Sequence, residues 1–244
     1  MQELMKKLIL AIADAGLTQI VYYSLHILTF VSVFVVAVWL GKRMNISVVK
    51  SILTVVILYP IMDTWKRILY WLETGVYGGE NNVRIFVYVP LMTLLVAMIL
   101  KINKKKLCDF VAPLMALTQG IGHFACIFAG CCKGYPVSWG IYNHLVDDYL
   151  FPIQPIEAIS ALLIVWYLIY RMKKRNYVED GFAYPLMLIL FGSTRFIWEF
   201  FRDNDKLVWG CSSLAFHALF MCIVGIIAVI IMKKRMATNR IKNV

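Results

Sequence analysis

Three charged residues near position 200 carry the strongest chemical signal in this sequence. Arg195, Glu199 and Arg202 are spaced i, i+4 and i+7, so a helix would present them on one face. The surrounding residues are mostly apolar, and an ionised arginine at the centre of a membrane helix costs about 2.5 to 3.5 kcal/mol. Two explanations stay open: an ion pair within the helix, or a cavity that binds a charged ligand.

A second cluster lies between residues 120 and 134, where glycine, histidine and cysteine are concentrated. Gly120, Gly122 and Gly130 permit either close packing of two helices or an exposed backbone. Exposed N–H groups bind anions. The segment therefore suits a phosphate head group or, alternatively, plain helix packing.

The same segment holds four residues with metal-binding or redox chemistry: His123, Cys126, Cys131 and Cys132. Their spacing has one adjacent cysteine pair and no second C-x-x-C, unlike the usual structural zinc site. We therefore assign no metal and expect no cofactor. Cys131 or Cys132 could instead form a disulfide with Cys211 under oxidising conditions.

The elements that must position these residues are membrane helices. The chain has 244 residues, of which 61% are hydrophobic, and its apolar runs reach the roughly 20 residues that cross a bilayer. The sequence predicts an all-α, multi-pass membrane protein with one integral membrane domain, 1–244. Seven spans are expected, at about 20–40, 47–72, 83–101, 108–130, 155–171, 181–201 and 212–232.

Basic residues follow the first, third, fifth and last of these spans. Positive charge marks cytoplasmic loops, so the N-terminus is expected outside and the C-terminus inside. Residues 1–19 are then a candidate amphipathic segment on the outer surface, and 233–244 a basic cytoplasmic tail. Topology and contact with anionic lipid account for most of the net charge of +11. We expect no nucleic acid partner.

With this topology, the polar residues inside the spans share one depth. His123, Gln154, Glu157, Arg195 and Arg202 all fall near the outer ends of their spans. We therefore expect one cavity, open to the outer leaflet and covered by the loop 131–154. Gln154 and Glu157 should lie near its rim.

Four patches together resemble the prolipoprotein diacylglyceryl transferase family. Residues 120–134 resemble its signature G-R-x-G-N-F-x-N-G-E-x-x-G, residues 152–157 its P-x-Q-L-Y-E, and residues 195–202 its R-F-x-x-E-x-x-R. Tyr77-Gly78-Gly79 resembles the family's H-G-G loop, and Tyr23 resembles a tyrosine near the start of the first span.

The resemblance implies a seven-span enzyme of the bacterial inner membrane whose site faces the outer leaflet. Such an enzyme transfers a diacylglyceryl group from phosphatidylglycerol to a cysteine thiol of an exported precursor and releases glycerol 1-phosphate. Arg195 would hold the phosphate, and Glu199 and Arg202 would complete the charged frame. The remaining lipid-binding positions implied are Tyr23, Gly78, Gly79, Gly130, Gln154 and Glu157.

This chain departs from the family signature. His123 replaces its arginine, Cys126 and Ala129 replace its asparagines, Cys131 replaces its glutamate, and Tyr77 replaces the loop histidine. His123 remains a catalytic candidate because an imidazole can donate a hydrogen bond to phosphate or accept a thiol proton.

Three functions stay open on these departures. The first is diacylglyceryl transfer to a precursor cysteine, or a related transfer of a lipid group to another acceptor. The second is a non-catalytic membrane protein that binds a phospholipid or an exported peptide in the same place. The third is a thiol-redox protein that uses Cys126, Cys131 and Cys132.

Overall fold

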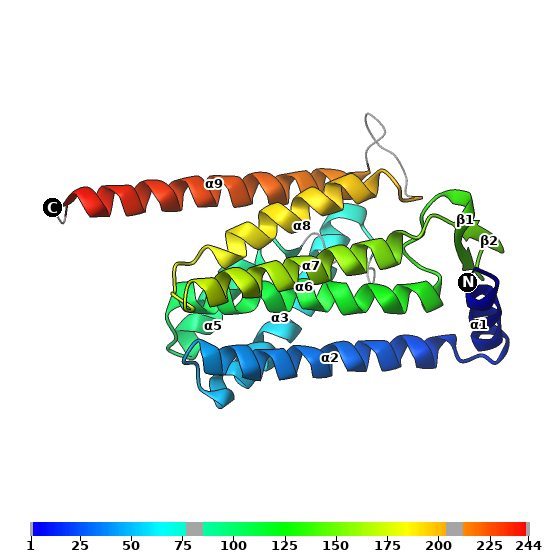
Figure 1. The fold of residues 1–244 in the computed structure, drawn as a ribbon, viewed down its shortest axis with the longest axis horizontal. Coiled ribbons are helices and arrows are strands. Elements are labelled where there is room, and N and C mark those ends of the chain that lie inside the picture. Colours follow the sequence, from blue (N-terminus) through cyan, green and yellow to red (C-terminus); the bar gives the residue numbers. More distant parts are fainter. Residues whose placement is uncertain (1, 77–84, 204–211, 243–244) are drawn as a thin grey trace.

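A computed structural model describes residues 2–76, 85–203 and 212–242 (Figure 1). The described part consists of eight helices and one pair of strands. The longer helices run side by side in one bundle, and α1 lies across one end of it (Figure 1). The helices are α1 (Gln2–Asp14), α2 (Thr18–Arg43), α3 (Val48–Thr74), α5 (Val89–Ile99), α6 (Lys104–Ala129), α7 (Ile153–Lys174), α8 (Ala183–Glu199) and α9 (Ser213–Lys242).

Five of these helices, α2, α3, α6, α7 and α9, are long and apolar enough to cross a membrane. The mainly helical, multi-pass prediction is therefore confirmed. The count of seven is not, because α5 has 11 residues and α8 has 17. The start of the span expected at 83–101 lies partly outside the described residues. The cellular side of each terminus stays a prediction, although α1 and the end of α9 lie at opposite ends of the molecule (Figure 1).

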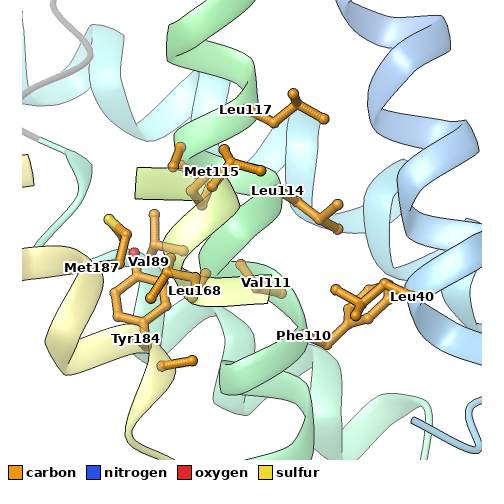
Figure 2. Close-up of a cluster of buried hydrophobic side chains, with 14 of the residues drawn as sticks. Leu40, Val89, Phe110, Val111, Leu114, Met115, Leu117, Leu168, Tyr184 and Met187 are labelled. Atoms are coloured by element: carbon orange, nitrogen blue, oxygen red, sulfur yellow. The ribbon is translucent and has the colours of Figure 1, made fainter. Parts of the chain in front are cut away.

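Helix α6 is the centre of the bundle. Of its most apolar window 67% is buried, against 44% or less for the other long helices, and it packs on α2, α5, α7 and α8. Asn103 starts α6 by accepting hydrogen bonds from Lys105 N and Lys106 N. Side chains from α2, α5, α7 and α8 surround it in the core (Figure 2). The labelled core residues are Leu40, Val89, Phe110, Val111, Leu114, Met115, Leu117, Leu168, Tyr184 and Met187.

The loop expected at 131–154 contains a small antiparallel sheet that the sequence analysis did not predict. Strands β1 (Pro136–Asn143) and β2 (Asp148–Leu150) pair through Tyr142 and Tyr149. The hairpin lies with α1 at the end of the bundle where α6 ends and α7 begins (Figure 1). Ile9 of α1 is buried against Tyr142. The hairpin and α1 together thus form a head on this end of the bundle.

The opposite end of the bundle has its own buried polar group. Asp109 of α6 accepts hydrogen bonds from Gly181 N and Ala183 N, both at 2.8 Å. These N–H groups lie at the start of α8, where a helix leaves its first donors unsatisfied. Asp109 therefore joins the start of α8 to the central helix.

Candidate active site

Glu157, in the first turns of α7, is the meeting point of the predicted site. Arg195 Nη1 donates to its Oε1, and Arg202 Nη2 donates to its Oε2. All three side chains are at most 6% exposed. One buried carboxylate therefore binds two guanidinium groups, which come from α8 and from the segment that follows it.

A second carboxylate completes the frame. Arg195 Nη2 lies 2.9 Å from Glu199 Oε2, one turn along the same helix. Ser212 Oγ donates to Glu199 Oε1 at 2.7 Å and also accepts from Ala215 N at the start of α9. Two arginines and two glutamates then balance in charge. The ion pair left open by the sequence is present, and it belongs to a larger network rather than standing alone.

His123 and Gln154 border this network. His123 Nε2 lies 3.6 Å from Glu157 Oε2, and Gln154 Nε2 donates to the Cys131 carbonyl oxygen at 2.9 Å. The structure thus brings His123, Glu157 and Arg195 together, as expected from their shared depth. Gln154 and Glu157 are both 6% exposed, so they line the interior rather than an open rim.

The chain reverses direction sharply after α6. Gly130 caps the helix with φ +68°, and Cys132 follows with φ +56°. Both values are left-handed, which glycine adopts freely and other residues seldom do. Asn143 Nδ2 of β1 donates to the Gly130 carbonyl at 2.9 Å and holds the turn. This reversal returns Cys132 toward His123 and Cys126 on α6.

Hydrogen bonds from the neighbouring thiols favour an ionised thiol at Cys132. The Cys126 and Cys131 thiols and the Arg202 charge hold the pKa of Cys132 well below its usual value, although burial opposes them. Contact with Cys126 lowers the pKa of Cys131, but Cys132 and burial outweigh it and raise that pKa to about 11. The thiolate is the form that acts as nucleophile or metal ligand, so Cys132 is the more reactive of the two.

The segment after the turn covers the arginines. Gly134 pairs with Arg202 in an isolated bridge, and Asp203 N donates to Lys133 O at 3.0 Å. Three aromatic rings stack above this contact, with centroids 4.9 to 6.1 Å apart. They belong to Tyr135, Phe151 and Phe201. These contacts join the loop 131–154 to the segment after α8; that the loop covers a lipid-binding cavity stays a prediction.

The space beside the network is small. A pocket of about 10 Å³ lies between α7 and α8, close to the volume that one water molecule needs. Its lining includes Glu157, Ser160, Arg195 and Trp198. The groups expected around a cavity are gathered, but in the described residues they fill the site with ion pairs.

The remaining predicted lipid-binding residues have different surroundings. Gly130 is the helix cap described above. Tyr23 is 61% exposed on α2, and its ring packs edge-on against Tyr22, so nothing in the described residues joins it to the network. Gly78 and Gly79 lie outside the described residues, as does Cys211.

Ser212 and Asn143 are polar contributors that sequence reasoning missed. Both are 4% exposed or less, and both act across long separations in the chain, on Glu199 and Gly130 respectively. A serine just before an apolar helix is a recognisable N-cap signal. Nothing in the local sequence around Asn143 indicates its contact.

The fold and this network define a multi-pass helical membrane protein with a charged site buried at the end of the bundle that carries the head. The sequence profile of the prolipoprotein diacylglyceryl transferase family matches residues 10–232. The chain therefore belongs to this family, as its motifs predicted.

Individual relatives resemble the chain moderately. A phosphatidylglycerol–prolipoprotein diacylglyceryl transferase of Clostridium tetani (strain Massachusetts / E88) is 32% identical over 129 residues, which is 50% of this chain and 51% of the relative. One from Clostridium perfringens (strain 13 / Type A) is 30% identical over 139 residues, 52% of each chain. One from Clostridium novyi (strain NT) is 26% identical over 192 residues, 71% of this chain and 72% of the relative. The chain thus spans about half the length of the first two relatives.

Proposed function

We propose that this protein transfers a diacylglyceryl group from phosphatidylglycerol to the cysteine thiol of an exported precursor. Family membership supports the reaction class. The observation that carries the proposal is the convergence of Arg195 and Arg202 on Glu157, inside the membrane-embedded bundle. Two guanidinium groups in one buried place are suited to a phosphate.

The reaction would use these charges on the leaving group. As the carbon–oxygen bond of the lipid breaks, negative charge grows on the phosphate. Arginines that are already fixed by Glu157 and Glu199 need little reorganisation to stabilise that charge, and their water-poor setting strengthens the effect. Glu157 accepts from one nitrogen of each guanidinium group, so an incoming phosphate either displaces it or binds the N–H groups that it leaves.

The proposed site faces the outer leaflet of the bacterial inner membrane. The head lies at one end of the bundle (Figure 1), and the network is built from the start of α7 and the end of α8 at that same end. The basic residues that mark the cytoplasmic side include Lys104–Lys106 at the start of α6 and Arg171–Arg175 at the end of α7, at the opposite end of the bundle. Phosphatidylglycerol and an exported peptide would then reach the network from the same side.

The direct test is turnover by the purified full chain in detergent or vesicles. It would be incubated with head-group-labelled phosphatidylglycerol and a peptide that carries the precursor cysteine. We expect release of labelled glycerol phosphate and a matching gain in peptide mass. A peptide with serine in place of the cysteine is the control. Lipid that stays intact with the cysteine peptide would contradict the proposal.

A second candidate is binding of phospholipid or exported peptide without transfer. The changes from the family signature at His123, Cys126 and Cys131 favour it. This protein would retain labelled phosphatidylglycerol, with loss of retention in Arg195→Ala, but would release no glycerol phosphate.

A further inference from the structure

Three side chains that bind soft metals meet beside the charged network. One ligand atom each from His123, Cys126 and Cys132 lies within 4.8 Å of the other two. Ligands of a tetrahedral zinc ion stand about 2.0 to 2.3 Å from the metal, so their mutual separation is about 3 to 4 Å. The three groups need only a small movement to share one ion.

The fold builds this cluster from two separate pieces of chain. His123 and Cys126 are spaced i and i+3, so they share a face of α6. Cys132 reaches the same place because the left-handed residues Gly130 and Cys132 turn the chain back. The cluster therefore depends on a turn that linear motif spacing does not reveal, which is why the sequence assigned no metal.

The His123 ring has the environment of a metal ligand. Its Nε2 lies 3.6 Å from the Glu157 carboxylate, whereas its Nδ1 is buried and forms no hydrogen bond with any described residue. Metal-binding histidines usually direct the second ring N–H at a carboxylate. Glu157 could take that part, which leaves Nδ1 as the nitrogen for a metal.

Ligand type and number indicate which metal fits and what it could do. Two cysteine sulfurs with one imidazole suit Zn²⁺. Zinc with four protein ligands is structural, whereas zinc with three keeps a position for water or substrate. Cys131 is outside the group of three; its Sγ lies 4.0 Å from the Cys126 carbonyl oxygen. The fourth position is thus not assigned to the described residues.

We propose that His123, Cys126 and Cys132 bind a zinc ion, and that the acceptor cysteine binds this ion through its sulfur before it is alkylated. The second half of this statement rests on the proposed transferase function. Zinc deprotonates a coordinating thiol outright, so it would replace the general base that His123 was expected to supply.

The step balances without an oxidant or reductant. The acceptor thiol gives its proton to water when its sulfur binds zinc. A sulfur lone pair then forms a bond to the glyceryl carbon that carries the phosphate oxygen. The electron pair of the broken carbon–oxygen bond stays on the phosphate, which Arg195 and Arg202 hold. The products are a thioether on the acceptor and glycerol 1-phosphate, and the neutral thioether is a weaker zinc ligand.

Metal content tests the first half. The full chain, purified with reductant, should hold about one zinc per chain by elemental mass spectrometry. Cys126→Ser and Cys132→Ser should each weaken zinc binding at least tenfold, because even changes around the ligands cost about 10- to 100-fold. Cys108→Ser and Cys222→Ser are matched controls in α6 and α9 that should keep the metal. Equal zinc content in all four variants would overturn the site, as would wild-type protein purified with reductant that holds no zinc.

Cobalt tests the open position first in the unmodified protein, where misfolding of a variant cannot interfere, and then in Cys131→Ser. Co²⁺ in the site should give visible bands of a tetrahedral thiolate complex, and a cysteine peptide should shift them while a serine peptide does not. Cys131→Ser should leave the spectrum unchanged. A spectrum that does not respond to the cysteine peptide but changes in Cys131→Ser would mean that Cys131 is the fourth metal ligand. That result would overturn binding of the acceptor cysteine to the metal.

The two proposals can fail separately. A chain that binds zinc and the cysteine peptide but releases no glycerol phosphate would contradict the transferase function and leave the metal site standing. A chain that keeps full turnover after its metal is removed by a chelator would leave the function standing and overturn the role of zinc.

Discussion

Asp109 and Glu157 lie at opposite ends of the bundle, and their partners differ in kind. Asp109 accepts two backbone N–H groups at the start of α8, whereas Glu157 accepts two arginine side chains. A carboxylate on backbone donors completes a helix start that any sequence would need. A carboxylate that neutralises two buried guanidinium groups offsets the cost of burying their charges, a cost that apolar residues at the same positions would avoid. The second arrangement therefore points to function, the first to stability.

The neighbouring ion pairs support this contrast. At the Asp109 end, Asp180 pairs with Arg171 at 2.9 Å and with Arg175 at 2.7 Å, and the Arg175 side chain is 50% exposed. The Arg175 end of the second pair is open to solvent, and exposed pairs are worth about 0 to 1 kcal/mol. Arg195 and Arg202 are 6% exposed or less, so removal of their carboxylate partner should strongly lower the free energy of unfolding.

The largest difference between the ends should appear in turnover. Arg195→Ala removes a buried phosphate donor, and we expect glycerol phosphate release to fall about 10²- to 10³-fold. Arg171→Ala, which removes an arginine from a carboxylate at the other end, should leave turnover unchanged. Arg195→Lys tests whether charge alone suffices, because lysine cannot form the two-pronged contact. Wild-type turnover in Arg195→Ala would remove its assignment.

Glu157→Gln should cause the largest loss of stability. It leaves Arg195 and Arg202 buried without their shared carboxylate, so the free energy of unfolding should fall by about 3 to 5 kcal/mol. Unfolding of the purified protein in a denaturing detergent measures this loss. Asp180→Asn is the comparison at the other end, and it should cost clearly less. Equal losses of unfolding free energy in the two variants would contradict a special role for the buried pairs of Glu157.

Asp109→Asn should affect stability and spare the chemistry. The amide keeps one acceptor oxygen and loses a charge-assisted hydrogen bond, which costs about 1.5 to 3 kcal/mol. The rate of glycerol phosphate release per folded molecule should match the wild type. A reduced rate with normal unfolding would show that this end takes part in the reaction.

The smallest expected effect separates helix capping from lipid binding at Gly130. Gly75→Ala and Gly130→Ala each place a side chain at left-handed φ, near +70°, with a strain of about 1 to 2 kcal/mol. The added carbon at position 75 meets nothing within 4 Å, whereas at position 130 it meets Leu145 at 2.8 Å and Asn143 at 3.1 Å. Gly130→Ala should therefore lose more stability. A KM for phosphatidylglycerol that changes in folded Gly130→Ala but not in Gly75→Ala would favour the lipid-binding role.

The sequence predicted the charged site better than the parts that surround it. Helical spacing and basic loops were enough to place His123, Glu157, Arg195 and Arg202 at one depth, because both rules act locally along a membrane helix. The hairpin, the Ser212 contact and the return of Cys132 depend on turns and on contacts between distant segments. Left-handed φ at a cysteine is rare, so spacing alone gave no reason to expect it.

The bridge between Gly134 and Arg202 has a mechanical consequence. Arg202 and Cys132 lie on two strips of backbone that are tied by this bridge and by the Asp203–Lys133 hydrogen bond. If a phosphate draws Arg202 away from Glu157, the strip that carries Cys132 is pulled with it. Binding of the lipid at Arg202 would thus change the position of the Cys132 sulfur. The order in which lipid and peptide bind would then be set by the fold.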